Sequence, residues 1–312
     1  MKNVSEMIPF PEREEQLLAS GTRKMLAHDY LAAKKDFEQL CEEVHSFENT
    51  QLLVEVYRLL GDFEGAIYHA EEYKQEYLAQ EHTLESYLHL LLLDEQYLSV
   101  RRILQQYPNE SVQKDLIQLE GTQDLIGERE YLAKEYQLQQ WDQQRSPILG
   151  RQWHLWLKGM SLTRFIHLVK DYLVVSKNPF LPPKLVEELL ACGVEENIMV
   201  KTLFNEEKFI DFSKLKPLEE MAELHLLLKM IADEWENQDP QMAEGISLEA
   251  QAHFALLYPF LPNVSEISDW EQSYRLEYLG MFGDDQSLER LKKYHEIQEI
   301  KQKLREIYQE LS

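Results

Sequence analysis

The chain has 312 residues and a formal net charge of −24, with 56 acidic against 32 basic residues. Its length allows one to three domains with a large buried core. Nucleic acids and anionic membrane surfaces are not expected as partners, because both attract basic surfaces and no basic stretch stands out.

Three short stretches recur at nearly equal spacing in the first hundred residues. Each carries an aromatic residue, at Tyr30, Phe63 and Tyr97, so the intervals are 33 and 34 residues. A period of this size is typical of helix-turn-helix repeats, in which each unit buries its apolar face against the next. Such repeats usually hold other molecules and do no chemistry, so the pattern indicates a functional class without naming the partner.

The second stretch shows how each unit is expected to fold. Gly61 is suited to the left-handed conformation that closes a first helix, and the carboxylate of Asp62 is suited to capping the next one. Ala33 and Ala66 each follow an aromatic residue by three positions, where a small side chain lets two helices approach. One helical turn later, on the same side, come Phe37, Ala70 and Leu104.

These units resemble the tetratricopeptide repeat, whose pattern has a small residue in helix A, an aromatic near the start of helix B, then Ala, then an aromatic. The matching residues are Gly21, Tyr30, Ala33, Phe37, Tyr57, Phe63, Ala66 and Tyr97. The third unit departs from the pattern at Leu88 and Val100, and Pro108 ends it. The resemblance covers roughly residues 14–110 and implies an all-α, right-handed superhelical solenoid. A generic helical bundle with accidental spacing is the alternative.

The following segment, 111–145, is polar and rich in Gln and Glu. Its leucines have some helical spacing, which we expect to be broken near Gly121 and Gly127. Pro147 and Gly150 then interrupt the helical pattern. We therefore predict a boundary around residue 145, between helical repeats at 1–145 and a C-terminal helical domain at 146–312.

Most of the C-terminal domain is predicted to be helical. Helices are expected to begin at or near Ser161, Pro183, Pro217, Pro240 and Asp269. The last of these ends at 278–284 with a Gly-Asp pair like that of the second repeat, which suggests another helix pair. Apolar residues at 297–311 keep heptad spacing for only two heptads, so a packed terminal helix is favoured over a dimerisation zipper.

One stretch is predicted to form strands. Residues 198–204 are mostly apolar with β-branched members, and 208–212 alternate apolar and polar side chains around a turn candidate at 205–207. A small hairpin near 198–212 is the favoured interpretation. The alternative is a short helix before Phe204 and a loop after it.

Three C-terminal stretches resemble the corresponding region of uncharacterised tetratricopeptide-repeat proteins from Gram-positive bacteria. They are the proline-rich segment 178–185, the hairpin, and 256–260. That group carries no assigned reaction, so this resemblance implies no activity.

No catalytic signature is present in the sequence. HExxH, a P-loop, GxGxxG after a strand and GxSxG are all absent. Cys41 and Cys192 are far apart and no CxxC occurs, which is typical of a reducing compartment. No signal peptide is recognised, and no apolar run approaches the ~20 residues of a membrane span. We expect a cytoplasmic protein that is not an enzyme and has no catalytic residue, cofactor or metal.

A few residues invite a ligand hypothesis, and each has a plainer structural interpretation. His82 and His89 share a helix face but lie two turns apart, which makes a poor metal site. The paired carboxylates at 284–285 are more typical of a helix cap. Trp153 and Trp156 are more often core residues than an aromatic wall.

The concave surface that helix A lines in tetratricopeptide repeats is therefore the candidate site. The positions carried over from the family are Glu15, Leu18, Thr22, Gln51, Glu55, Arg58, His82, Glu85 and His89, with Glu48 beside them. Some family members grip a partner's C-terminal carboxylate with Lys and Asn at such positions, but this chain has Leu18, Thr22 and Leu52 there, so a clamp is not expected.

The acidic groove predicts a non-enzymatic scaffold that binds a basic or amphipathic protein segment. A monomer is favoured, and the partner's identity is left open. One alternative is that these residues are merely solvated and the interface lies elsewhere. The other is an unrecognised enzyme or a regulatory protein acting through the C-terminal helical domain.

Overall fold

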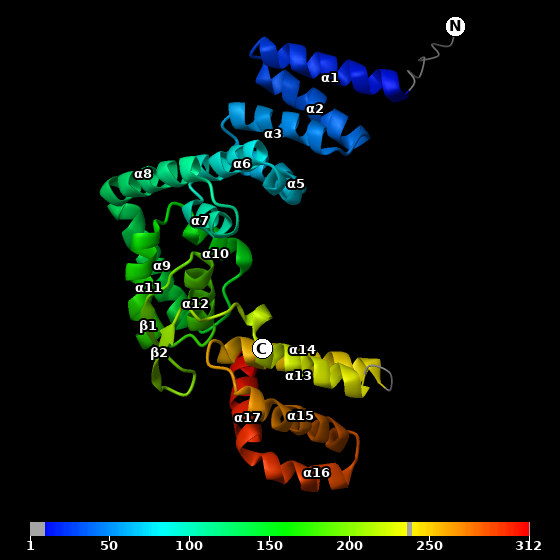
Figure 1. Ribbon diagram of the computed structural model, residues 1–312, viewed down its shortest axis with the longest axis vertical. Coiled ribbons are helices and arrows are strands. Elements are labelled where there is room, and N and C mark those ends of the chain that lie inside the picture. The colour runs from blue at the N-terminus through cyan, green and yellow to red at the C-terminus, as the bar shows by residue number, and fades with distance from the viewer. Residues whose placement is uncertain (1–9, 236–238, 312) are drawn as a thin grey trace. The chain divides into compact units, whose positions relative to one another are not determined.

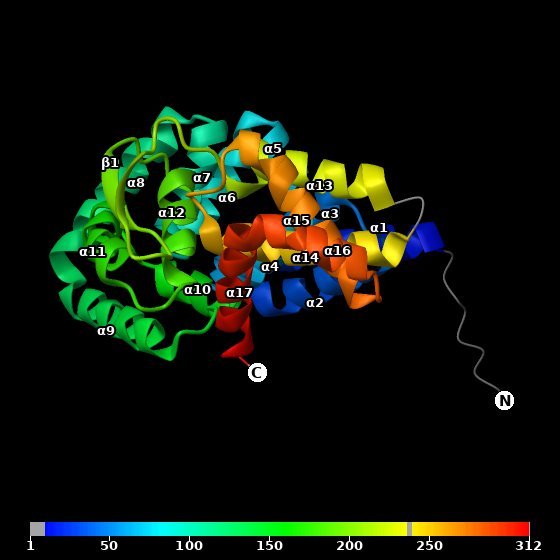
Figure 2. The same cartoon turned by 90° about the horizontal axis from the view of Figure 1, so that it is seen from below.

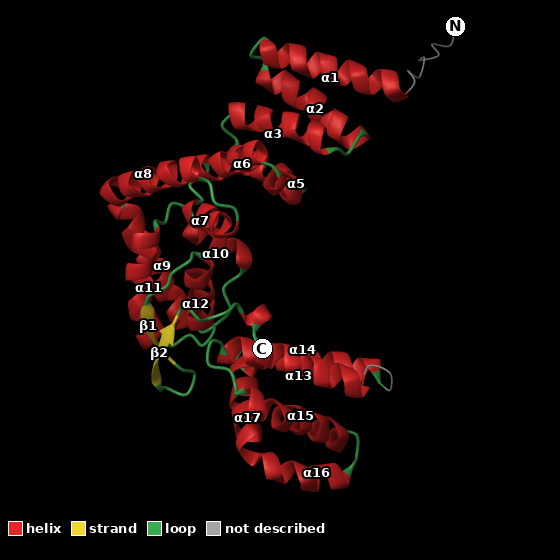
Figure 3. Cartoon of the chain, in the orientation of Figure 1, coloured by secondary structure: helices red, strands yellow, loops and turns green. Residues whose placement is uncertain are grey.

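The computed structural model describes residues 10–235 and 239–311, and these are mostly helical with one small sheet (Figures 1 and 3). The chain forms two compact units. The N-terminal unit comprises the described residues up to 126 together with 157–161, and the C-terminal unit comprises 127–156 and the described residues from 162. Within the described part of the chain, no helix is both long and apolar enough to cross a membrane.

The N-terminal unit is a succession of helices in which sequence neighbours pack together (Figure 1). Their bounds are α1 Phe10–Leu26, α2 Tyr30–Glu43, α3 Phe47–Leu59, α4 Phe63–Glu71, α5 Lys74–Ala79, α6 Glu81–Leu93, α7 Tyr97–Gln106 and α8 Glu110–Ile126. The predicted second helices begin at the three aromatic residues, as α2, α4 and α7. The short helix α5 was not predicted.

The turns before these second helices share one backbone conformation. His28, Gly61 and Glu95 all adopt positive φ, at 59°, 74° and 58°, so the intervals of 33 and 34 residues hold in the backbone. After each of them an amide closes the same six-residue ring, for example from Asp62 N to Tyr57 O at 3.0 Å. Only the second turn uses glycine, and the other two place a side chain in a conformation that favours glycine.

Aspartates cap two of the three second helices. Asp29 Oδ1 accepts from Ala32 N at 3.2 Å, and Asp62 Oδ1 accepts from Gly65 N at 3.0 Å. The third turn has Gln96, whose side chain instead donates to Asp94. The predicted cap at Asp62 is therefore confirmed, and the third helix begins without a side-chain cap.

The predicted small positions lie in the core of the N-terminal unit. Ala33, Ala66 and Val100 are all fully buried. Phe37 is also buried and lies against Gly21, where a Cβ would come within 2.6 Å of the phenyl ring. Close helix approach therefore depends on these small side chains, as their spacing predicted.

The C-terminal unit contains the remaining helices and the hairpin. Its α-helices are α9 Glu128–Gln144, α10 Gly150–Leu157, α11 Leu162–Val175, α12 Leu181–Ala191, α13 Ala222–Trp235, α14 Pro240–Leu257, α15 Ile267–Met281, α16 Asp285–Leu291 and α17 His295–Gln309, with short 3-10 turns η1 Leu218–Glu220, η2 Val264–Glu266 and η3 Lys292–Tyr294. Helix α17 lies across α14 and α15, as Figures 1 and 2 show.

The boundary between the units differs from the one placed at residue 145. The division falls between α8 and α9, and residues 157–161 return to the N-terminal unit. The returning segment is tied there by Lys158 Nζ to Asp94 Oδ1 at 2.7 Å and by Gly159 N to Glu95 O at 2.7 Å. A second difference is Gly121, which lies inside α8 and does not break it. The break at Gly127 is present.

The predicted hairpin is confirmed. Strands β1 Asn197–Lys201 and β2 Glu207–Asp211 pair antiparallel, with Ile198 opposite Ile210. Asn205 has φ of 66° in the connecting loop. Ile198, Val200 and Ile210 are buried, so one face of the hairpin packs on the unit. The alternative of a short helix before Phe204 is wrong.

Tryptophans form part of the core of the C-terminal unit. The Trp153 and Trp156 rings stack with centroids 5.0 Å apart, and Trp141 packs 5.7 Å from Trp156. All three are at least 94% buried. The indole nitrogen of Trp153 donates to Glu188 at 3.0 Å, which satisfies its polar atom. The core interpretation of Trp153 and Trp156 is therefore confirmed.

The last helices follow their sequence pattern. Leu304 of α17 is fully buried, with Ile297, Ile300 and Ile307 packed partly buried beside the same core. The turn between α15 and α16 repeats the earlier geometry, since Gly283 has φ of 97° and Asp284 N bonds to Leu279 O at 3.1 Å. Asp284 then caps α16, as its paired carboxylates predicted.

Candidate functional site

A groove of about 960 Å³ opens in the N-terminal unit. Helices α3, α5, α6, α7 and α8 all contribute to its lining, together with the turn before α7. Helices α3 and α6 each pack against the second helix of their pair, α4 and α7, and α8 packs on both α6 and α7. The sides of α3, α6 and α8 that remain open line the groove.

The structure brings together only part of the predicted site. Gln51, Glu55, Arg58 and His89 line the groove. Glu15, Leu18 and Thr22 line a separate hollow of about 480 Å³ on α1. Glu48, His82 and Glu85 line neither of these two cavities.

The groove carries more negative than positive charge. Arg58 donates two hydrogen bonds of 2.6 Å each to the Glu55 carboxylate, so the charges of these two side chains offset each other. The same contact raises the pKa of the Arg58 guanidinium. Asp115 and Glu95 add two further carboxylates. His89 Nε2 lies 3.1 Å from Asp115 Oδ2, within hydrogen-bonding distance of that carboxylate.

The floor of the groove is aromatic and its edge is aliphatic. Tyr77, Tyr87 and Tyr97 are buried, and the Tyr77 and Tyr87 rings lie 5.5 Å apart. Burial raises the pKa of both phenols, and Tyr87 also donates a hydrogen bond to Glu71. Leu93 and Leu119 remain 46% and 37% exposed. The groove therefore offers apolar surface together with the carboxylates of Glu55, Glu95 and Asp115.

Most of the groove lining was not among the predicted site residues. The missed residues include the two exposed leucines and two of the carboxylates, Leu93, Leu119, Glu95 and Asp115. Leu93 and Glu95 lie at the end of α6 and in the next turn, beyond the positions carried over from the family pattern. Asp115 and Leu119 lie on α8, which was treated as a polar segment outside the repeats. Their spacing of four residues on one helix face was the available signal.

No metal centre is formed within the described ranges, which contain no cluster of three or more His, Cys, Asp or Glu side chains suited to a metal ion. His89 contacts Asp115 and does not form a site with His82. Cys41 and Cys192 are not joined by a disulfide. Burial raises the pKa of the Cys41 thiol, which disfavours a reactive thiolate there.

Comparisons of this chain with protein-family models, with curated proteins and with solved structures give no match.

Proposed function

We propose that the N-terminal unit is a protein-binding module that takes a basic, amphipathic peptide segment into its groove. In this proposal the helix pairs form a tetratricopeptide-like right-handed solenoid and the protein acts as a scaffold without catalysis. The recurring turn at His28, Gly61 and Glu95 supports the repeat architecture. Cys41 and Cys192 are free thiols, which accords with a cytoplasmic location.

The observation that carries the proposal is the combination of exposed leucines and carboxylates in one groove. Leu93 and Leu119 offer apolar contact, which provides most of the binding free energy of a peptide in a groove. Asp115 and Glu95 select for positive charge and reject acidic segments. The net charge of −24 extends this preference over long range at low salt.

The test uses a fluorescently labelled helical peptide of leucine and lysine, and a counterpart in which glutamate replaces lysine. Fluorescence anisotropy is measured with the full-length protein. The lysine peptide is expected to bind and the glutamate peptide is not. Asp115→Lys reverses a charge inside the groove and is expected to weaken binding about tenfold, since ~1.4 kcal/mol changes a dissociation constant by that factor.

The matched control is Glu42→Lys, which makes the same kind of charge reversal at an exposed residue of α2 outside the groove lining. It is expected to leave binding nearly unchanged. Equal weakening by both variants would reduce the interaction to overall charge and reject the groove. Failure of the lysine peptide to bind the unmodified protein would reject the basic, amphipathic partner.

A further inference from the structure

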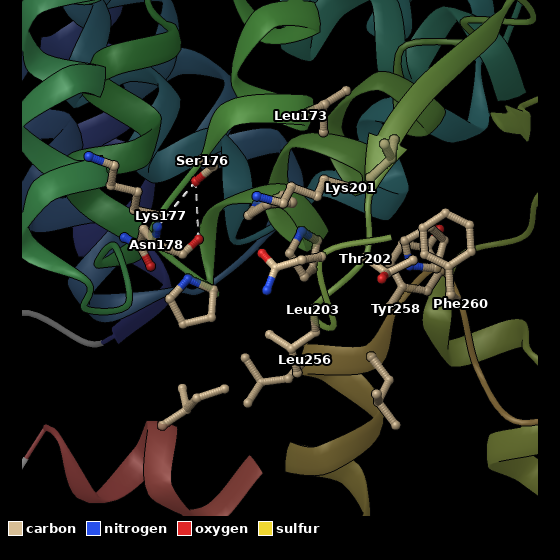
Figure 4. Close-up of a pocket in the computed structure, with 18 of the residues that line it drawn as sticks. Leu173, Ser176, Lys177, Asn178, Lys201, Thr202, Leu203, Leu256, Tyr258 and Phe260 are labelled. Atoms are coloured by element: carbon tan, nitrogen blue, oxygen red, sulfur yellow. Dashed lines mark hydrogen bonds between the residues drawn. The ribbon is translucent and has the colours of Figure 1, made fainter. Parts of the chain in front are cut away.

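A second cavity, of about 380 Å³, lies within the C-terminal unit (Figure 4). The ends of α9, α11, α12, α14 and α17 and the end of β1 meet around it. Its lining mixes apolar and polar side chains, and Leu203 and Phe260 are apolar lining residues that remain partly exposed. A cavity of this size and mixed lining suits a small organic molecule that has both an apolar part and a polar group.

The charged residues around this cavity have the opposite balance to the rest of the protein. Arg145, Lys177 and Lys201 line it, with Glu310 as the acid among the lining residues. Arg145 Nη1 is 4.0 Å from Glu310 Oε2, so these two charges offset each other. In the described part of the chain neither lysine has a carboxylate within 4.0 Å. The lining therefore keeps two positive charges in a chain whose net charge is −24.

The loop that carries Lys177 is fixed by hydrogen bonds to Asp142 and from Asn178. Asp142 Oδ1 accepts from Ser176 Oγ at 2.6 Å, from Lys177 N at 2.8 Å and from Asn178 N at 3.1 Å. The Asn178 side chain is 1% exposed and donates to two backbone carbonyls, those of Trp141 and Ser146. The Lys177 backbone is thus preorganised, which lowers the entropic cost of binding.

Lys201 is positioned by the hairpin. It is the last residue of β1 and pairs in register with Glu207 of β2. Its side chain extends from the strand toward Ser176, whereas the Lys177 side chain lies at the far edge (Figure 4). Lys201 is therefore the ammonium group best placed to meet a ligand inside the cavity, and Lys177 lies on its rim.

We propose that this cavity binds a small organic anion, with its carboxylate or phosphate group on Lys201 and its apolar part against Leu203 and Phe260. A lysine ammonium binds either head group as a point charge. Lys201 is half-buried, so water screens its contact with the head group less than it would screen that of a fully exposed lysine. Lys177 adds attraction at the rim. This site is independent of the peptide groove.

The test uses three probes with the same phenyl group: phenyl phosphate, 3-phenylpropionate and the neutral 3-phenylpropanol. Binding to the full-length protein is followed by backbone amide chemical shifts, at millimolar probe concentrations. At least one anion is expected to shift the amides of Ser176 and Lys201 with 1:1 stoichiometry, and comparing the two anions shows which head group the site prefers. The neutral probe is expected to bind at least about tenfold more weakly than the preferred anion, a difference of ~1.4 kcal/mol or more in binding free energy.

Three variants assign the binding to its residues. Lys201→Gln is expected to weaken anion binding about tenfold, while Lys201→Arg keeps the charge and retains binding. Lys177→Gln is expected to have a smaller effect in the same direction. Lys229→Gln removes an exposed charge on α13 outside the lining and is expected to change nothing.

Either of two results overturns the proposal. One is the absence of binding by both anions. The other is binding that Lys201→Gln leaves unchanged or that Lys229→Gln weakens equally. Folding of each variant is checked by circular dichroism, and the Lys201→Arg result separates loss of charge from loss of structure.

Discussion

Two helical glycines of the N-terminal unit have opposite surroundings. A Cβ added at Gly21 would lie 2.6 Å from the Phe37 ring, whereas one added at Gly121 would meet no atom within 4 Å. The same substitution therefore has different physical consequences at the two positions. At Gly21 it adds volume to a filled core, and at Gly121 it only restricts the unfolded backbone.

Gly21→Ala is accordingly expected to destabilise the protein by roughly 1–3 kcal/mol through overpacking. Gly121→Ala is its control and is expected to stabilise by about 0.5–1 kcal/mol, because alanine is the better helix former. Urea unfolding followed by far-ultraviolet circular dichroism measures both. A stable Gly21→Ala variant would show that α1 and α2 do not approach as closely as the Phe37 contact requires.

At the scale of the element, α4 depends on its capping residue. The helix has nine residues, and such a short helix is marginal on its own. Asp62 satisfies the amide of Gly65, one of the donors that the helix start leaves without an intrahelical acceptor. The cap also follows directly on Gly61, so the turn and the helix start are fixed together.

Asp62→Ala is expected to cost about 1 kcal/mol, and Asp62→Asn much less because asparagine is an equally good cap. Hydrogen exchange of the amides from Phe63 to Ala66 measures the effect locally. Faster exchange in the alanine variant alone is the expected result. Equal exchange in the two variants would mean that packing, and not the cap, fixes the start of α4.

At the scale of the whole molecule, the C-terminal unit contains a buried ionic cluster. Lys301 is fully buried, and its ammonium lies 2.5 Å from Glu277, which also accepts from Arg305 at 2.5 Å. Arg305 reaches Glu249 as well, at 2.6 Å. Burial lowers the pKa of Lys301 to about 8, and burial lowers the pKa of the neighbouring His253 to about 4.

This cluster predicts acid sensitivity. Between pH 6.5 and about pH 4, His253 takes up a proton in the unfolded chain but stays neutral in the folded one, so stability falls as the pH drops through this window. Glu277 continues the loss below 4.5. Burial would raise its pKa, but Arg305 and Lys301 overcome this and lower it to about 2.

His253→Gln keeps a polar partner near Tyr274 and removes the titration. The free energy of unfolding of this variant is expected to fall less steeply between pH 6.5 and 4 than that of the unmodified protein. The slopes differ by up to ~1.4 kcal/mol per pH unit, which corresponds to the uptake of one proton on unfolding. Urea unfolding by tryptophan fluorescence measures this, because all five tryptophans lie in the C-terminal unit. Identical pH profiles for the two proteins would refute a buried neutral His253.

Local features were predictable from the sequence. The starts of α2, α4 and α7, the cap at Asp62, and the hairpin all follow from spacing, from turn chemistry and from alternation of apolar residues. Each of these signals acts between residues close in the chain, so the sequence contains it directly. The break at Gly127 belongs to the same class, while Gly121 shows that one glycine costs too little to interrupt a helix.

Only a minority of the groove lining was predictable, namely Gln51, Glu55, Arg58 and His89. Glu55 and Arg58 lie on a helix whose exposed face the repeat pattern predicts. Asp115 and Leu119 belong to α8, and their place in the groove depends on where α8 packs relative to α3 and α6. No residue near them in the sequence encodes that position.

The sequence by itself determined the helical class, the phase of the repeated turns and the position of the hairpin. Tertiary structure alone decided the return of residues 157–161 to the N-terminal unit, the full set of residues that line each cavity and the burial of Lys301. In sequence, Lys301 is one more polar residue on an amphipathic helix. Its burial is possible because Glu277 on α15 supplies the opposite charge that an isolated helix lacks.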